Sequence, residues 1–128
     1  MAGIVSQRIL VVDDDADLRE SLAFLLTLKG YDVVTACDGR EALQTVQAGP
    51  PPSLILLDLM MPEMDGFQFR RALLDDPALA DIPVVLCSAN PTAPQVVQQL
   101  GALACFEKPF DVQLLLNVVA SQTQAATH

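Results

Sequence analysis

Short apolar runs alternate with segments of helical periodicity along most of the chain. The runs cover residues 9–12, 32–36, 54–57, 84–87 and 104–106. Runs of this length, rich in β-branched residues, are typical of the buried strands of a parallel sheet. Between the runs, apolar residues recur on one side of a helix, as Leu18, Leu22, Leu25 and Leu26 do before Gly30. Five strand–helix alternations predict an α/β fold with a doubly wound parallel sheet.

Turn and capping residues set the expected ends of the helices. We expect helices over residues 16–29 and 40–48, a third from Gly66 to about Asp76, a short fourth ending near Gly101, and a fifth over 112–121. Asp111 is expected to be the N-cap of the fifth helix, and residues 122–128 a frayed polar tail. The whole chain, 1–128, is expected to be one domain with its core over about 8–121.

Polar residues follow four of the predicted strands. Asp13, Asp14 and Asp15 follow the first strand, Asp58 the third, Ser88 the fourth and Lys108 the fifth. Because the carboxyl ends of parallel strands share one edge, we expect these side chains to meet there. Crowded carboxylates raise one another's pKa values and form a site for a hard divalent cation such as Mg²⁺. Taken singly, each residue has an ordinary explanation; Asp15 or Asp17 suits a helix N-cap, and Asp65-Gly66 suits a turn.

Charge and composition narrow the function classes. The net charge is −9 with only seven Lys and Arg, so the chain has no basic patch for direct contact with nucleic acid. We see no stretch long enough to span a membrane and no secretory leader, and we expect a cytoplasmic protein. The three cysteines are widely spaced and the only histidine is His128, so cysteine metal ligation is not expected. We expect the thiols to be small buried groups.

Four motifs, ILVVDDDADLRE, LILLDLMMPEMDGFQF, VVLCSAN and FEKPF, occur in this order. Together they closely resemble the receiver domain of two-component response regulators, over essentially the whole chain from Arg8 onward. The resemblance implies a (βα)5 fold with strand order 2-1-3-4-5. It also implies a set of site residues: Asp58 as phosphoacceptor, Asp13 and Asp14 as the acidic pair that holds Mg²⁺, the Met60 backbone carbonyl as a further metal ligand, Ser88 as the responding hydroxyl and Lys108 as the lysine that contacts the phosphoryl group.

The function implied is Mg²⁺-dependent phosphoryl transfer to Asp58 from a histidine kinase or a histidine phosphotransfer protein, which switches partner binding. Such a chain is not a turnover enzyme on external substrates. The alternative is a degenerate receiver that binds partners without phosphorylation. A haloacid-dehalogenase-type phosphatase is less consistent, because Asp17 stands where its motif needs Thr or Val. We expect no output domain within the chain.

Two departures from the family pattern lie near the predicted fifth strand. Cys105 stands where an aromatic residue is usual, three positions before Lys108, and Phe106 should point to the other face of the strand. This leaves the coupling of Ser88 to an aromatic side chain open. The segment from Ser88 to Gly101 carries prolines and looks shorter than is common in the family, so its loop and helix are expected to be reshaped.

The last predicted helix carries more apolar residues than one core-facing stripe needs. Val112, Leu115, Leu116 and Val119 make the stripe, and Leu114 and Val118 form an extra pair. Because the fourth helix, fifth strand and fifth helix commonly form the output face in the resembled family, we expect this pair to bind a downstream protein or a second copy of the chain.

Overall fold

A five-stranded parallel sheet forms the centre of the computed structural model, which describes residues 7–61, 63–89 and 92–124. The strand order is β2-β1-β3-β4-β5, which confirms the predicted fold class and topology. The strands are β1 (Arg8–Val12), β2 (Asp32–Ala36), β3 (Leu54–Asp58), β4 (Val84–Ser88) and β5 (Ala104–Glu107). Every residue of β3 and β4 is buried, because helices cover both faces of the sheet.

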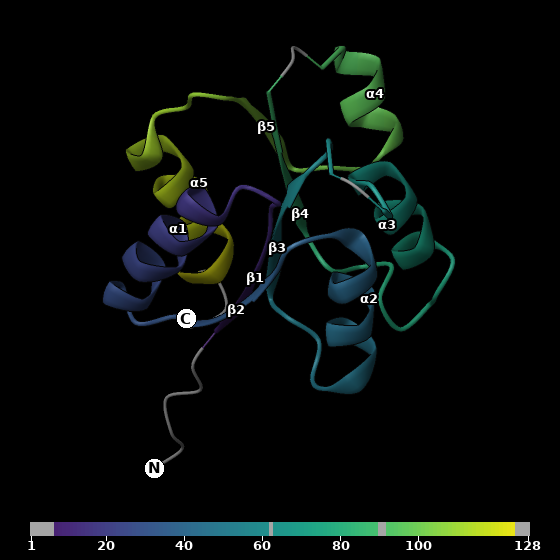
Figure 1. The fold of residues 1–128 in the computed structure, drawn as a ribbon, viewed down its shortest axis with the longest axis horizontal. Helices are drawn as coiled ribbons and strands as arrows, with labels where there is room; N and C mark the ends of the chain where they lie inside the picture. The colour runs from purple at the N-terminus through teal and green to yellow at the C-terminus, as the bar shows by residue number, and fades with distance from the viewer. Residues whose placement is uncertain (1–6, 62, 90–91, 125–128) are drawn as a thin grey trace.

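Two helical layers enclose the sheet. The helices are α1 (Ala16–Leu28), α2 (Gly39–Ala48), α3 (Gly66–Leu74), α4 (Pro94–Gln99) and α5 (Val112–Gln124). Figure 1 shows α1 and α5 on one face of the sheet and α2, α3 and α4 on the other. Two apolar clusters match these layers. One joins Leu10, Leu57 and Phe69, and the other joins Ile9, Leu22 and Val119. Successive side chains of each strand therefore pack into the apolar clusters on opposite faces of the sheet.

The cap residues place the helix starts next to the strand ends. Asp15 is the N-cap of α1 and accepts from the backbone N–H groups of Asp17 and Leu18, at 3.1 and 3.2 Å. Asp65 caps α3 in a reciprocal capping box with Gln68. The predicted cap at Asp111 is confirmed, since its side chain accepts from the backbone of Gln113 at 2.9 Å.

The predicted ends of two helices and the predicted burial of two cysteines were wrong. The third helix ends at Leu74 rather than near Asp76, and α5 continues to Gln124 rather than ending near Ser121. Part of the predicted frayed tail is therefore helical, and residues 125–128 lie outside the described residues. Cys87 is buried as expected, but Cys37 is exposed and Cys105 is partly exposed.

The two extra apolar residues on α5 differ in their exposure, so they do not form one exposed pair as predicted. Leu114 is 54% exposed, whereas Val118 packs against the core cluster beneath α5. The core-facing stripe itself is confirmed, because Leu115 and Val119 are fully buried and Val112 packs with them. In the part of the chain that the structure describes, none of the helices is both long and apolar enough to cross a membrane.

Candidate functional site

Parallel strands bring the predicted site residues to one edge of the sheet. Asp13 directly follows β1, Asp58 and Ser88 end β3 and β4, and Lys108 directly follows β5. The strand ladder continues past the strand ends, because the Asp13 N–H donates to Ala36 at 3.1 Å and the Lys108 N–H donates to the Ser88 carbonyl at 2.7 Å. The side chains are thus positioned by rigid backbone rather than by a loose loop.

The centre of the site is a buried group of opposite charges. The Lys108 ammonium lies 2.8 Å from Asp13 Oδ2 and 3.5 Å from Asp58 Oδ2. Asp13 and Asp58 are each only 3% exposed. A backbone N–H orients each carboxylate, since Asp15 donates to Asp13 Oδ1 at 2.9 Å and Met60 donates to Asp58 Oδ1 at 3.1 Å. Removing one member of such a group leaves buried charge without compensation.

Burial and neighbouring charge change the acidity of the site. Burial is the main reason that the pKa of Asp58 rises to about 6, and the nearby Asp13 carboxylate raises it further. The Met60 N–H and the Lys108 ammonium act in the opposite direction and limit the rise. For Lys108, burial lowers the pKa, but the hydrogen bond to Asp13 and the two carboxylate charges outweigh it, so the pKa is raised overall. The ammonium therefore stays charged at neutral pH.

Three carboxylates are close enough to share a cation. One oxygen from each of Asp13, Asp14 and Asp58 lies within 4.8 Å of the others. Asp14 is exposed, while the other two are buried, so the cluster opens to solvent on the Asp14 side. Hard carboxylate oxygens with an open side suit Mg²⁺, which keeps several water ligands and binds through few carboxylates. Met60 lies beside the cluster through its backbone contact to Asp58.

Ser88 borders a hollow next to the acidic group. Ser88 is 3% exposed and lies at the end of β4. A hollow of about 190 Å³ is lined by Leu59, Met60, Phe67, Ser88, Thr92, Ala93 and Val96. Ser88 therefore lies between the end of the neighbouring strand β3 and the hollow, which α4 borders through Val96.

Three contributors to the site were not predicted from the sequence. The Arg19 guanidinium donates to the Asp13 carbonyl at 2.7 Å and so ties α1 to the end of β1. Gly66 packs on the Asp58–Leu59 backbone so closely that an added Cβ would lie 2.7 Å from Leu59 Cα. Gly39 makes a similar approach, and its N–H donates to the Met64 carbonyl at 2.9 Å. Only the Asp65-Gly66 turn signal pointed to one of these.

The expected orientations on β5 are confirmed. Cys105 packs with the cluster on the α2–α3–α4 side, and Phe106 packs with the cluster on the α1–α5 side. Phe106 lies against Phe110, with ring centroids 5.9 Å apart. At the position three residues before Lys108, the side facing α4 therefore carries a thiol instead of an aromatic ring.

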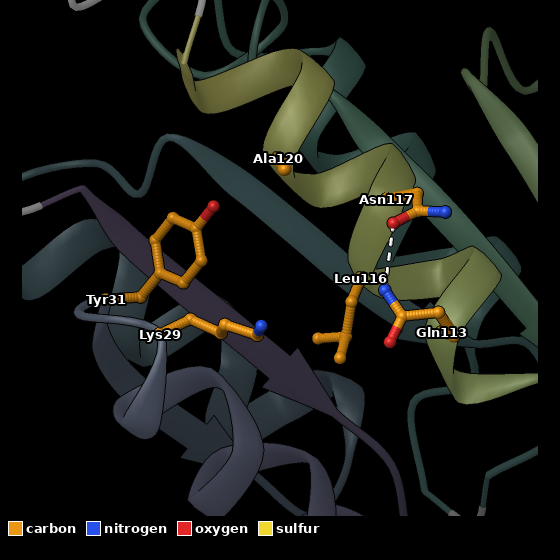
Figure 2. A pocket seen from close by; sticks show the side chains of 6 residues that line it. All are labelled: Lys29, Tyr31, Gln113, Leu116, Asn117 and Ala120. Atoms are coloured by element: carbon orange, nitrogen blue, oxygen red, sulfur yellow. Dashed lines mark hydrogen bonds between the residues drawn. The ribbon is translucent and has the colours of Figure 1, made fainter.

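A second hollow, of about 160 Å³, lies at the far end of α1 from Asp13. Figure 2 shows its lining, which comes from the connection between α1 and β2 and from α5: Lys29, Tyr31, Gln113, Leu116, Asn117 and Ala120. The two amide side chains in this lining form a hydrogen bond, in which Gln113 Nε2 donates to Asn117 Oδ1 at 3.0 Å. Among the described lining residues, Lys29 and Tyr31 are ionisable and none is a carboxylate, so their charges differ from those of the acidic edge.

Comparison with known proteins agrees with the architecture. The sequence model of the response regulator receiver domain matches residues 9–120. The chain is 46% identical over 123 residues to the response regulator PleD of Caulobacter vibrioides, covering 94% of this chain and 27% of PleD. It is 39% identical to the DNA-binding dual master transcriptional regulator RpaA of Synechocystis, covering 85% of this chain and 46% of RpaA. The chain therefore spans between about a quarter and a half of these relatives.

Solved structures give the same result. The chemotaxis response regulator CheY4 of Vibrio cholerae superposes with a TM-score of 0.82 at 32% identity, covering 91% of this chain and 98% of that one. The response regulator TrrA of Thermotoga maritima, in complex with Mg²⁺ and BeF, superposes with a TM-score of 0.79 at 29% identity, covering 91% of this chain and 98% of that one. The chain belongs to the receiver domain family of two-component response regulators.

Proposed function

We propose that Asp58 accepts a phosphoryl group in a Mg²⁺-dependent reaction, with Asp13, Asp14, Lys108 and Met60 completing the site. The observation that carries this proposal is the position of Asp58. Its carboxylate is buried at the end of β3, within 4.8 Å of two other carboxylates and 3.5 Å from the Lys108 ammonium. A nucleophile, a cation site and a fixed positive charge are the parts that phosphoryl transfer requires.

Asp58 acts as the nucleophile. One of its carboxylate oxygens forms a bond to phosphorus while the phosphorus–nitrogen bond of a phosphohistidine breaks, and the electron pair returns to the imidazole of the donor. Lys108 lies close enough to Asp58 to neutralise an oxygen of the incoming group as a point charge. The Met60 N–H holds the acceptor carboxylate in place during the transfer.

The chemistry of the acidic cluster fits Mg²⁺. Both oxygens of Asp13 already accept hydrogen bonds, from Asp15 and from Lys108. Asp14 is exposed and is therefore the freer direct ligand, with Asp13 acting mainly through water. Asp58 and the Met60 backbone carbonyl complete the proposed ligand set. When bound, the ion neutralises the negative edge and the oxygens of the transferred group. The related TrrA, whose structure is a complex with Mg²⁺ and BeF, supports this assignment.

Ser88 is the proposed sensor of the phosphorylated state. It lies at the end of the strand next to β3 and borders the hollow between the acidic edge and α4. A hydrogen bond from its hydroxyl to the phosphoryl group would change the start of the β4–α4 connection. The intact set of site residues favours this function over a degenerate receiver.

Receiver domains take phosphoryl groups from histidine kinases, and we propose a histidine kinase or a histidine phosphotransfer protein as the donor for this chain. Leu114, exposed on α5, is the proposed contact for a downstream protein or a second copy. A cytoplasmic location and the absence of turnover on external substrates stay predictions. So does the absence of direct nucleic-acid contact, because RpaA is named as DNA-binding and the chain spans only part of it.

Intact mass measurement tests this function. The chain is incubated with acetyl phosphate, with Mg²⁺ or with EDTA. We expect one added phosphoryl group with Mg²⁺, none with EDTA, and none for Asp58→Asn under either condition. The control is Asp81→Asn, at an exposed position remote from the acidic cluster, which should be phosphorylated like the parent. Phosphorylation of Asp58→Asn at the rate of the parent would rule out the assignment.

A further inference from the structure

Arg70 is a buried charge outside the acidic edge. It lies on α3 and is 4% exposed. Within the described residues it forms no ion pair, whereas the buried carboxylates of the site are paired with Lys108. Its Nη1 atom is buried and has no hydrogen-bond partner there. Burial lowers the pKa of the guanidinium, which reflects the cost of keeping a charged group away from water.

The contact that Arg70 does make is at the end of another helix. Its Nε–H donates to the Leu100 carbonyl at 2.7 Å. Leu100 is the C-cap of α4, and the Arg70 Nη2 lies 3.4 Å from the position that a Cβ on Gly101 would occupy. The side chain therefore crosses from α3 to the point where α4 ends.

The turn that ends α4 leaves the carbonyl of its C-cap residue, Leu100, available for this contact. Gly101 has a φ of +65° and donates to the Gln98 carbonyl at 3.0 Å, and Ala102 donates to Val97 at 3.2 Å. This pair of bonds is a Schellman motif, which satisfies two carbonyls of the last turn. The carbonyl of Leu100 takes the Arg70 donor instead.

Among the described residues, α4 has few buried contacts. The helix has six residues, none of them fully buried, and its N-cap Ala93 offers no side-chain hydrogen bond. Val97 and Leu100 pack against the α2–α3–α4 core only with partly buried side chains. A short helix is stabilised mainly by the side chains that it buries against the core. Because α4 buries none completely, a single buried hydrogen bond contributes a large part of what positions it.

We propose that Arg70 is a positioning residue whose Nε–H hydrogen bond to Leu100 fixes the C-terminal end of α4 against α3. The bond, rather than the charge, does the positioning. Since α4 follows the connection that begins at Ser88, the bond also sets the resistance of α4 to displacement when Asp58 is phosphorylated; this second part rests on the proposed function.

Two variants of equal length separate the bond from the charge. In Arg70→Gln, the glutamine side chain ends with an amide nitrogen at the position of the Arg70 Nε, so it keeps a donor. Arg70→Met ends with a methyl group at that position and has no donor. Both variants remove the charge and the unpartnered Nη1, so neither leaves a buried charge. Arg71→Met, at the exposed neighbouring position, is the control for losing a positive charge.

Hydrogen exchange of backbone amides in the unphosphorylated protein tests the first part. The amides of Leu100, Gly101 and Ala102 report on α4, and those of Ala42 and Phe69 report on the rest of the same layer. In Arg70→Met we expect about tenfold faster exchange for the α4 amides alone, which corresponds to the loss of one hydrogen bond. Arg70→Gln and Arg71→Met should exchange like the parent, within about threefold.

Three results would overturn the positioning role. The α4 amides of Arg70→Met could exchange as slowly as those of the parent. Arg70→Gln could exchange as fast as Arg70→Met, which would assign the role to the charge. If the Ala42 and Phe69 amides of Arg70→Met also exchanged about tenfold faster, Arg70 would stabilise the whole helical layer and not the end of α4 in particular.

The second part is tested with Mg²⁺ and acetyl phosphate. Arg70→Met should be phosphorylated at the rate of the parent by intact mass, because Arg70 has no contact with the acidic edge. The difference in α4 exchange between phosphorylated and unphosphorylated protein should shrink at least threefold in this variant and persist in Arg70→Gln. An undiminished difference in Arg70→Met would overturn the link to phosphorylation. If the parent itself took no phosphoryl group, the proposed function would fail, while the unphosphorylated comparison would still decide the role of Arg70.

Discussion

The two sides of the functional edge are built differently. On one side, Asp13 directly follows β1 and Asp58 ends β3. Both carboxylates are almost completely buried and are held by backbone N–H groups and by Lys108. On the other side, β5 is only partly buried, and α4 has no fully buried residue. The acidic side is therefore rigid and the α4–β5 side is more easily displaced. The proposed phosphoryl transfer needs fixed atoms and the proposed response needs a movable element. Ser88 lies between the acidic edge and the hollow that α4 borders.

The same comparison applies to buried charge. Around Asp58, charges of both signs are close together. The pKa of its carboxyl is raised, because the Met60 N–H and the Lys108 ammonium do not fully offset burial and the Asp13 carboxylate in the absence of a cation. Around Arg70, within the described residues, no opposite charge pairs with the guanidinium, and one carbonyl takes its donor. The buried charges around Asp58 suit the proposed cation binding and phosphoryl transfer, whereas at Arg70 the proposed role belongs to the hydrogen bond to Leu100 and not to the charge.

Loss of Lys108 should have the largest effect. In Lys108→Ala, phosphorylation of Asp58 by acetyl phosphate with Mg²⁺ should slow by on the order of 100-fold, because the fixed charge opposite the transferred group is gone. A time course of intact mass measures the rate. Lys29→Ala, at the exposed end of α1, is the matched control and should react like the parent. A Lys108→Ala rate within about twofold of the parent would remove this residue from the reaction.

Gly66→Ala should disturb the rigid side through backbone contact. The new Cβ would lie 2.7 Å from Leu59 Cα, next to the acceptor, and backbone atoms there cannot move away cheaply. We expect the free energy of unfolding to fall by about 1–3 kcal/mol, as for other overpacked sites. Urea unfolding measures it. Gly49→Ala is the control, because the nearest atom to its Cβ is the end of the Arg8 side chain at 3.8 Å. Equal stability of the two variants would contradict the close approach.

The incomplete compensation at Asp58 predicts a pH-dependent stability difference. The folded-state pKa of about 6 lies above the ordinary value of 3.8, so ionising Asp58 costs stability as pH rises from about 4 to 6. Without divalent cations, Asp58→Asn should be more stable than the parent at pH 7 by on the order of 1–2 kcal/mol, and the gain should vanish near pH 4. Urea unfolding at both pH values, with Asp81→Asn as control, decides it. A gain that is equal at both pH values would show that ionisation is not its cause.

Ser88→Ala should have the smallest effect on chemistry and should act on the movable side. We expect its phosphorylation rate to stay within about threefold of the parent, since the nucleophile, the carboxylates and Lys108 are unchanged. The change in α4 hydrogen exchange on phosphorylation should shrink, while Ser21→Ala, on the exposed surface of α1, should respond fully. A full response in Ser88→Ala would separate Ser88 from the switch.

The fold and the acidic edge could be predicted because they depend on local patterns. The apolar runs fixed which segments become strands, and the parallel sheet then brought residues as far apart as Asp13 and Lys108 into contact. The cap at Asp111 and the opposite faces of Cys105 and Phe106 follow from equally local rules.

What could not be predicted depends on tertiary contacts. Helix α5 continues beyond its predicted end, and there the Thr123 hydroxyl shares a hydrogen bond of 2.8 Å with the Tyr31 hydroxyl from a distant part of the chain. Nothing in the sequence marks Arg70 as buried, since a long polar residue on a helix is usually exposed. Helical periodicity alone also could not separate Val118 from Leu114, because neighbouring helices determine how wide the buried face is.

Locating the phosphoryl group along the chain tests directly whether Asp58 is the single acceptor. After reaction with acetyl phosphate, borohydride reduction converts a phosphorylated aspartate into homoserine, which peptide mass spectrometry locates. With Mg²⁺ we expect homoserine at position 58 alone, and with EDTA none at any position. Homoserine at position 13 or 14, or equal conversion of Asp58 with EDTA, would contradict an acidic edge in which a cation held by Asp13 and Asp14 serves a single acceptor, Asp58.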